Sequence, residues 1–517
     1  MLRAEQNKFA VETGPGTPMG NLFRRYWIPA MHASELPENE CPPVRIKLMS
    51  ERLLAWRDTQ GRYALTDEFC AHRGVSLWFG RNEQNGLRCP YHGWKYDHTG
   101  QCIEVPSEPS ESGYCQKIKL KSYPLIERGG VLWTYMGPPE KQPPLPEWEF
   151  ATVPTEQSFM SKRLQECNWL QAMEGGIDSS HVSFLHSGEL NSDPLFKGSK
   201  GNQYNMGDMK PVFEVVESPG GLYIGARRNA ENGNYYWRIT QYVLPAFTMI
   251  APRADHPVHG HFWVPIDDHN CWAWSFDYKV TRPLSAKERK SMEDGQGIHV
   301  AYVPGTFIPA ANKSNDYLID REGQKLGKTY SGVYGIGMQD ASLQESMGPI
   351  IDRTKENLVS TDNGIIMARH KLLRALKTME KGETPPGVSA EHQRVRSAAV
   401  VASTSTFSRL VPSDGTTVTA YPPRSPRYGQ AFGPTATGQW TTAVGGPGST
   451  LSRRHYKQFT VTANASGAVR VDSLVFWNAI YNTTGLAGVS YSLTGFAVGN
   501  ADSVNVTNGV GPLGTLT

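Results

Sequence analysis

The chain has 517 residues, of which 39% are hydrophobic, and its formal net charge is only +3. This length exceeds what one hydrophobic core usually serves, so we expect two or three domains. The near-neutral charge argues against a nucleic-acid groove and against attraction to an acidic membrane surface.

The first residues are polar, and no stretch of the sequence reaches the roughly eighteen apolar residues that a membrane span requires. All seven cysteines lie within the first 271 residues, and a metal site claims two of them. The odd number that remains fits reduced thiols better than a disulfide framework. We therefore expect a soluble, cytoplasmic protein with no membrane and no nucleic-acid partner.

Residues 43–148 have the pattern of short antiparallel strands, with a hairpin signal at 97–100. The proline-rich run at 137–146 breaks regular structure and predicts a linker. We place a domain boundary near residue 150, so that residues 1–150 form a small antiparallel β domain with an N-terminal segment.

Two mixed pairs of metal-ligating side chains stand in this segment: Cys70 with His72, and Cys89 with His92. Thiolates on one iron and neutral imidazoles on the other are the ligands of a Rieske [2Fe-2S] cluster, which passes single electrons. A structural zinc site is the alternative. We favour the cluster because zinc fingers usually group like ligands, whereas each pair here is mixed and lies in a glycine-containing loop.

Residues 151–401 mix strand and helix signals. Aromatic, alternating stretches at 235–242, 261–264 and 272–278 predict an antiparallel sheet with an apolar face. A helix is predicted from near residue 356 to residue 382, with apolar residues at helical spacing between Ile365 and Leu376. The fold class we expect is therefore α+β.

A second metal site is predicted at His181 and His186. Two histidines and one carboxylate can bind one face of Fe(II) and leave positions open for oxygen. On a continuous helix, Glu174, Asp178 and His181 would share one face, but His186 would be rotated by about 140° from His181. Both imidazoles can reach one iron only if the helix ends or bends between them.

The pattern Asp178-x-x-His181-x-x-x-x-His186 downstream of the paired Cys and His loops resembles the α subunits of Rieske aromatic-ring hydroxylating oxygenases. Within that family it resembles the phthalate 4,5-dioxygenase group. The likeness extends to the segments 14–20, 24–27 and 166–169, and it covers about residues 1–400.

The resemblance implies roles for further residues. It points to Asp362 as the third iron ligand, with Asp352 and Glu356 as competitors. It also implies that the Asp178 carboxylate links His181 to the cluster ligand His92 of a neighbouring subunit.

A substrate anion would need a cation in a dry pocket, and the planar guanidinium of arginine binds a carboxylate through two hydrogen bonds. The candidates are Arg227, Arg228 and Arg238, which lie among the aromatic strands. Each of them could instead be a surface charge at a strand edge.

The resemblance implies an oxygenase that adds both atoms of O2 to the ring of an aryl carboxylate such as phthalate, giving a cis-dihydrodiol. It implies a homotrimer or stacked trimers, and electrons from NADH through a separate reductase, since the sequence has no dinucleotide fingerprint or four-cysteine ferredoxin pattern. Two alternatives stay open: a monooxygenase or O-demethylase of an aromatic acid, and an electron-transfer protein with a non-catalytic interaction region.

From residue 402 the composition changes abruptly to Gly, Ser, Thr, Ala and Val. Residues 402–517 contain no Cys or Glu and only three Asp. Alternating segments at 458–463 and 468–475 predict strands, and residues 422–447 read as a flexible tether. We expect a β-rich extension, which the family resemblance does not cover.

Overall fold

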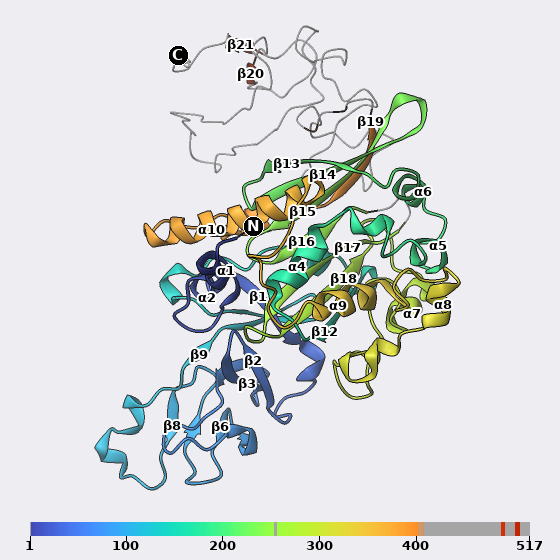
Figure 1. The fold of residues 1–517 in the computed structure, drawn as a ribbon. Helices are drawn as coiled ribbons and strands as arrows, with labels where there is room; N and C mark the ends of the chain where they lie inside the picture. The colour runs from blue at the N-terminus through green and yellow to red at the C-terminus, as the bar shows by residue number, and fades with distance from the viewer. Residues whose placement is uncertain are drawn as a thin grey trace.

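The computed structural model describes residues 2–252 and 256–402, residues 405 and 407, and two strands in the tail, β20 (Ala487–Tyr491) and β21 (Asp502–Val506), which pair antiparallel. Figure 1 shows small sheets at the lower end of the molecule and a large sheet with helices above them. Within the described residues, no helix is both long and apolar enough to span a membrane.

The N-terminal part begins with two helices, α1 (Ala4–Val11) and α2 (Pro18–Phe23). Helix α2 starts with Pro18 directly after Thr17, whose side chain accepts a hydrogen bond from the Gly20 N–H. Three small antiparallel sheets follow. In sheet order they are β1 (Trp27–His32), β11 (Val131–Tyr135) and β10 (Leu125–Arg128); β2 (Val44–Leu48), β3 (Glu51–Arg57), β4 (Tyr63–Asp67) and β9 (Ser122–Tyr123); and β5 (Arg81–Glu83), β6 (Gly86–Arg88), β7 (Lys95–Tyr96) and β8 (Cys102–Glu104).

The large sheet has eight antiparallel strands. In sheet order they are β12 (Ser158–Gln165), β18 (Cys271–Tyr278), β17 (Val258–Pro265), β16 (Phe247–Ile250), β15 (Tyr235–Val243), β14 (Gly221–Asn229) and β13 (Val212–Glu217), with β19 (Ala398–Ala402) off this path. One edge of β15 is shared, because β16 pairs with residues 241–243 and β19 pairs with residues 235–239.

Three helices pack on or beside this sheet, namely α4 (Trp169–Ile177), α9 (Ile336–Ser346) and α10 (Asn363–Glu380). Helix α4 lies across β15 to β18, α9 packs against α4, and α10 contacts β13 and β14. A Cβ atom on Gly176 would stand 2.1 Å from the Trp263 ring, so glycine permits this close contact of α4 with β17. The remaining helices are shorter: α3 (Glu149–Thr152), α5 (Glu189–Ser192), α6 (Lys200–Gly207), α7 (Ala286–Glu293) and α8 (Arg321–Lys325).

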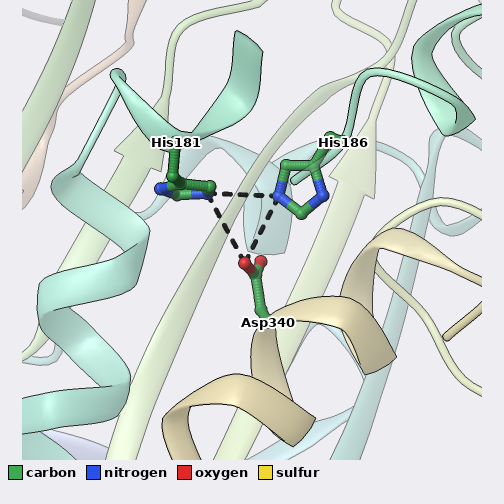
Figure 2. A group of neighbouring side chains, drawn as sticks. All are labelled: His181, His186 and Asp340. Atoms are coloured by element: carbon green, nitrogen blue, oxygen red, sulfur yellow. Dashed lines mark hydrogen bonds and ion pairs between the residues drawn. The ribbon is translucent and has the colours of Figure 1, made fainter. Parts of the chain in front are cut away.

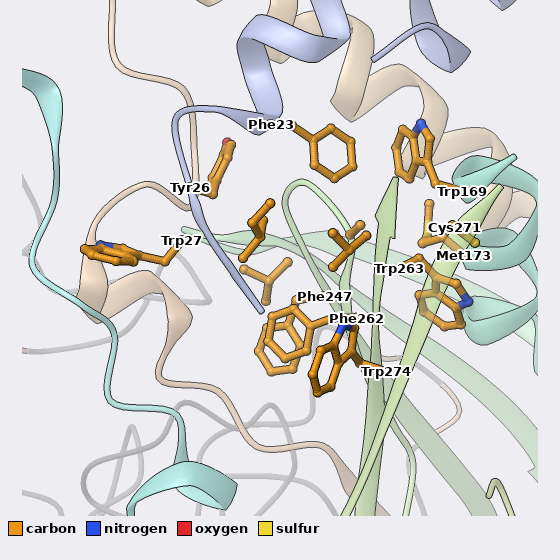
Figure 3. Close-up of a cluster of buried hydrophobic side chains, with 14 of the residues drawn as sticks. Phe23, Tyr26, Trp27, Trp169, Met173, Phe247, Phe262, Trp263, Cys271 and Trp274 are labelled. Carbon is orange, nitrogen blue, oxygen red and sulfur yellow. The ribbon is translucent and has the colours of Figure 1, made fainter. Parts of the chain in front are cut away.

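The main hydrophobic core joins the N-terminal segment to the large sheet (Figure 3). Phe23 of α2 packs edge-on against Trp169 at the start of α4, with ring centroids 4.7 Å apart. Phe247 and Phe262 stack at 4.5 Å between β16 and β17. Burying such aromatic rings contributes about 1.5–3 kcal/mol each, so α4 and the residues that follow it are held firmly over the sheet.

The predicted sheet is confirmed, since the stretches at 235–242, 261–264 and 272–278 lie in β15, β17 and β18. The hairpin at 97–100 is the turn between β7 and β8. The predicted late helix begins later than expected, at Asn363 instead of near 356, because a 3₁₀ turn (Ser360–Asp362) precedes it. The predicted tail strands at 458–463 and 468–475 and the tether at 422–447 lie outside the described residues.

Candidate metal centres

The four predicted cluster ligands lie in two neighbouring loops, one between β4 and β5 and the other between β6 and β7. The Cys70 thiol lies close enough to the Cys89 thiol to raise the pKa of Cys89 further than burial alone does, and the rings of His72 and His92 are 4.5 Å apart. The fold therefore places sulfur beside sulfur and imidazole beside imidazole. This is the arrangement that a cluster with one thiolate-bound and one imidazole-bound iron requires.

The donor atoms fit such a cluster. Nδ1 of His92 is buried and has no hydrogen-bond partner among the described residues, so it is available as a ligand. The backbone N–H groups of Tyr91 and His92 point at the Cys89 sulfur, as expected around a charged thiolate. Gly93, with φ of 76°, makes the turn that brings them there. Burial raises the pKa of the Cys89 thiol, a cost that metal binding would offset.

Tyr96 is fully buried, and its hydroxyl oxygen lies 3.2 Å from the Cys70 sulfur. A hydroxyl that donates to a ligand sulfur stabilises the more negative, reduced cluster and raises its potential. We expect Tyr96→Phe to lower the midpoint potential. A loss of about 1 kcal/mol between the redox states corresponds to roughly 40 mV for one electron. Redox titration of the visible spectrum measures this shift, and an unchanged potential would contradict the assigned hydrogen bond.

Three side chains from two distant segments meet over the large sheet (Figure 2). The Nε2 atoms of His181 and His186 are 3.1 Å apart, and Oδ1 of Asp340 lies 3.5 Å from the first and 3.3 Å from the second. Two ligands held about 2.1 Å from one ion at right angles stand about 3 Å apart. The three atoms therefore fit one face of an ion, the arrangement of two histidines and one carboxylate that suits Fe(II).

The end of α4 makes this meeting possible. The helix stops at Ile177, Asp178 has an extended backbone, and a 3₁₀ turn, η7 (His181–Ser183), follows. The single face that a continuous helix would give Glu174, Asp178 and His181 does not form, because the chain leaves the helix before Asp178. The condition that the chain must bend between the two histidines is met. Glu174 points elsewhere and forms buried ion pairs with Arg353 and Arg369.

Each histidine is held by its outer ring nitrogen. Nδ1 of His181 lies 3.1 Å from Oδ2 of Asp178, and Nδ1 of His186 lies 2.8 Å from Oε1 of Gln339. Burial alone would raise the pKa of Asp178, but His181 and two hydrogen bonds from Ser180 outweigh it and lower this pKa to about 2. Asp178 is therefore an anion that orients His181 with Nε2 toward the ion.

Asp362 does not meet the two histidines, and the prediction of this residue as third ligand is corrected to Asp340. Asp362 closes the turn before α10, where its carboxylate accepts a hydrogen bond from the Val359 N–H. An acid at a helix start is favoured by the helix dipole, which explains its presence there. The two alternative candidates for the third ligand form ion pairs away from the histidines. Asp352 is exposed and pairs with Lys355, and Glu356 pairs with Arg369.

The three predicted substrate arginines have different surroundings. Arg227 stacks over the Tyr235 ring at 4.4 Å and does not line the cavity at the metal site. Arg228 is buried, but it donates to the Ser179 carbonyl and the Ser183 hydroxyl and so fastens the segment that carries His181. Arg238 does line the cavity. The expectation is thus corrected for Arg227 and Arg228, and Arg238 remains.

A cavity opens beside the three side chains, and the empty space there amounts to about 650 Å³ only when the open solvent at its mouth is counted. Arg238 is 2% exposed, and its Nε and Nη1 atoms have no hydrogen-bond partner within the described chain. Burial lowers the pKa of Arg238, so its charged form is poorly compensated. Apolar side chains line part of the rest of the wall, namely Val182, Phe196, Ile250, Trp263, Ile298 and Ile336, beside a second buried arginine, Arg163, and the rings of His259 and His261. The cavity therefore suits an apolar ring that carries a negative group.

Comparison with known proteins agrees with both centres. Residues 26–124 match the Rieske [2Fe-2S] domain family, and residues 134–414 match the LigXa C-terminal domain like family. The chain is 37% identical to the 3-chlorobenzoate-3,4-dioxygenase oxygenase subunit of Comamonas testosteroni, over 76% of this chain and 93% of that protein. This chain belongs to the Rieske aromatic-ring oxygenases, as an α subunit.

Two further relatives of this Rieske oxygenase differ in their reactions. The phthalate 4,5-dioxygenase oxygenase subunit of Pseudomonas putida is 36% identical over 75% of this chain and 89% of its own length. The 5,5'-dehydrodivanillate O-demethylase oxygenase subunit of a Sphingobium strain is 33% identical over 75% of this chain and 84% of its own length. The Rieske oxygenase is thus an enzyme that holds a [2Fe-2S] cluster and a mononuclear iron. The alternatives of a zinc site and of a pure electron carrier are excluded.

Proposed function

We propose that this Rieske oxygenase adds both atoms of O2 to the ring of an aryl carboxylate and releases a cis-dihydrodiol. The mononuclear iron, held by His181, His186 and Asp340, supplies the activation of O2 when it is bound. The protein supplies the apolar cavity that holds the ring and the buried cation that holds the carboxylate. The observation that carries the proposal is Arg238 in the wall of this cavity, whose Nε and Nη1 atoms find no hydrogen-bond partner among the residues that the structure describes.

The surroundings of Arg238 favour a carboxylate over a neutral group. A buried guanidinium without partners is costly, and a planar carboxylate can accept from two of its N–H groups at once. His181 lies close enough to feel the charge of Arg238, but His181 already binds the Asp178 carboxylate. Two relatives are named as dioxygenases of 3-chlorobenzoate and phthalate, and both of these compounds are carboxylated rings.

We expect Arg238→Gln to raise KM for an aryl carboxylate by about 10- to 100-fold, because a hydrogen bond to a charged group contributes about 1.5–3 kcal/mol. Initial rates against substrate concentration measure this change. Arg227→Gln is the matched control, since it removes a neighbouring arginine that lies outside the cavity, and its KM should stay close to that of the wild type. Equal KM values for wild type and Arg238→Gln would contradict the carboxylate assignment.

A second reaction, O-demethylation or another monooxygenation of an aromatic acid, has one specific observation in its favour. The dehydrodivanillate O-demethylase aligns over nearly the same share of this chain as the dioxygenases do. The product separates the two reactions. A dihydrodiol supports dioxygenation, whereas a phenol with formaldehyde, or a benzyl alcohol, supports monooxygenation.

The test of the proposal is turnover with a reductase, NADH and a set of ring acids. The set contains phthalate, isophthalate, terephthalate, 3-chlorobenzoate and methoxybenzoates, and each product is identified by mass spectrometry. Benzamide serves as the uncharged control, and we expect it to react poorly. The proposal fails if uncharged rings are oxidised as well as the acids. It also fails if NADH is consumed without an oxygenated product from any acid.

The proposal includes a homotrimer in which the cluster of one copy serves the iron of the next. In Figure 1 the β5–β8 sheet lies at the lower end of the chain, well away from α4 and α9. Asp178 accepts three hydrogen bonds, which leaves one of about four acceptor positions open, and its side chain is 17% exposed. That position suits His92 of a second copy. An assembled form should oxidise substrate, whereas a separated monomer should keep the cluster spectrum and lose turnover.

Electrons would come from a separate reductase that oxidises NADH. Such a partner would place the reaction in the cytoplasm, which remains the location we expect. Omission of the reductase should abolish steady-state turnover while a chemically reduced protein still completes a single cycle.

A further inference from the structure

One buried amide contacts the metal site and has no role in the function proposed above. Gln339 is 0% exposed and directly precedes Asp340 in the first turn of α9. Its Oε1 atom lies 2.8 Å from Nδ1 of His186. Two neighbouring residues of one helix therefore reach the same imidazole, with Gln339 at Nδ1 and Asp340 on the Nε2 side.

The orientation of the amide is fixed by its other end. Nε2 of Gln339 donates to the Val333 carbonyl at 3.0 Å and to the Thr329 hydroxyl oxygen at 3.3 Å. Thr329 uses its own proton for the Val333 carbonyl, at 2.9 Å. Both amide hydrogens thus have acceptors, and turning the amide over would leave the Val333 carbonyl facing Oε1. Only the oxygen of Gln339 can face His186.

An oxygen at this place accepts a proton from Nδ1 and leaves Nε2 of His186 free for a metal ion. The nitrogen that carries the proton in a ligand histidine is set by the hydrogen bond of its outer nitrogen. The Asp178 carboxylate has the same effect on His181: it holds the proton on Nδ1 and leaves Nε2 free for the metal ion. The two ligand histidines are therefore oriented by different groups, one charged and one neutral.

We propose that Gln339 is a positioning residue that fixes the tautomer and the ring orientation of His186 for metal binding. This inference rests on the proposed ligand set of His181, His186 and Asp340. Loss of an outer hydrogen-bond partner of a ligand histidine typically weakens metal affinity by about 10- to 100-fold. The neutral amide offers this support without adding a second buried charge beside Asp340.

The experiment uses the full chain with its cluster in place, after the mononuclear iron has been removed and replaced by Co²⁺. Titration gives the Co²⁺ affinity. Proton NMR detects the exchangeable ring N–H signals that the cobalt ion shifts, one for each bound histidine, and Zn²⁺-loaded protein supplies the reference. Gln339→Leu removes the acceptor, and Gln339→Glu restores an oxygen at the same place. Ser342→Ala is the matched control, because it removes a hydrogen bond to the Gln339 backbone in α9 and leaves His186 untouched.

We expect two shifted N–H signals in the wild type, in Ser342→Ala and in Gln339→Glu. Gln339→Leu should retain one signal and bind Co²⁺ about 10-fold or more weakly, while its unchanged cluster spectrum reports a folded chain. Wild-type affinity and both signals in Gln339→Leu would overturn the inference. Loss of both signals in Gln339→Leu at saturating Co²⁺ would also overturn it, since the effect would not be confined to His186. If the wild-type protein does not bind one Co²⁺ ion at this site, the proposed ligand set itself is wrong.

Discussion

Asp340→Ala is expected to lose the mononuclear metal and substrate turnover while the cluster stays intact. Within the described part of the chain, Asp340 supplies the carboxylate oxygen that reaches both imidazoles, at 3.5 and 3.3 Å. Two neutral histidines without an anionic partner bind a divalent ion poorly. We expect turnover to fall by more than the roughly 100-fold that is typical of losing an outer partner. Iron analysis, the cluster spectrum and product formation measure the three effects separately.

Asp362→Ala is the control for this prediction, because the family resemblance favours that residue. Its carboxylate accepts only from the Val359 N–H at the start of α10 among the contacts described. Removal of such a group costs about 1 kcal/mol of stability and should leave iron content and turnover close to wild type. If Asp362→Ala lost the iron and Asp340→Ala kept it, the assignment from the structure would be wrong.

Asp178→Asn is expected to reduce turnover by about 10- to 100-fold. The carboxylate accepts hydrogen bonds on both oxygens, from Ser180 on Oδ1 and from His181 on Oδ2. The asparagine amide has one oxygen and one NH₂ group. Its NH₂ group must therefore face either the Ser180 N–H or the His181 N–H, and the hydrogen bond at that position is lost. The substitution also removes the anion that faces His181. Steady-state turnover, with iron content and cluster reduction measured in parallel, tests this expectation.

Ser180→Ala gives the comparison for Asp178→Asn. It removes one hydrogen bond from Oδ1 and leaves the carboxylate charged and bound to His181. A modest change in turnover is expected. If Asp178→Asn keeps its iron and loses turnover, a role in passing electrons between copies is supported. If it loses iron in proportion to turnover, Asp178 only holds His181, and the proposed link to His92 of a second copy fails.

The ligands that lie close together in the sequence could be predicted, and the distant one could not. His181 and His186 are five residues apart, and so a local pattern identifies them. Asp340 lies in a helix whose buried face includes Gln339, Ser342 and Gln344, and this polar face hides the apolar periodicity of α9. The family resemblance pointed instead to Asp362, which precedes a helix with a clear apolar stripe.

The roles of the three candidate arginines could not be predicted from the sequence either. Their spacing identifies three candidates, but the side that each one faces depends on strand register. Arg238 stands opposite Ala226, while Arg227 stands opposite Trp237. Opposed residues share a face of the sheet and successive residues alternate. Arg238 and Arg228 therefore face the cavity side, and Arg227 faces away. The residue pairing that decides this can be obtained only from the folded sheet.

The way β19 shares the edge of β15 limits where this chain can be shortened. Ala399 pairs with Arg238, and beyond the strand Phe407 stacks on Trp237 with ring centroids 5.4 Å apart. A cut at residue 401, the boundary suggested by composition, would remove the end of this strand and the Phe407 ring behind the cavity wall. Any trimming or exchange of the Gly- and Ser-rich extension should therefore begin after residue 407, and the family match that continues to residue 414 gives a safer limit.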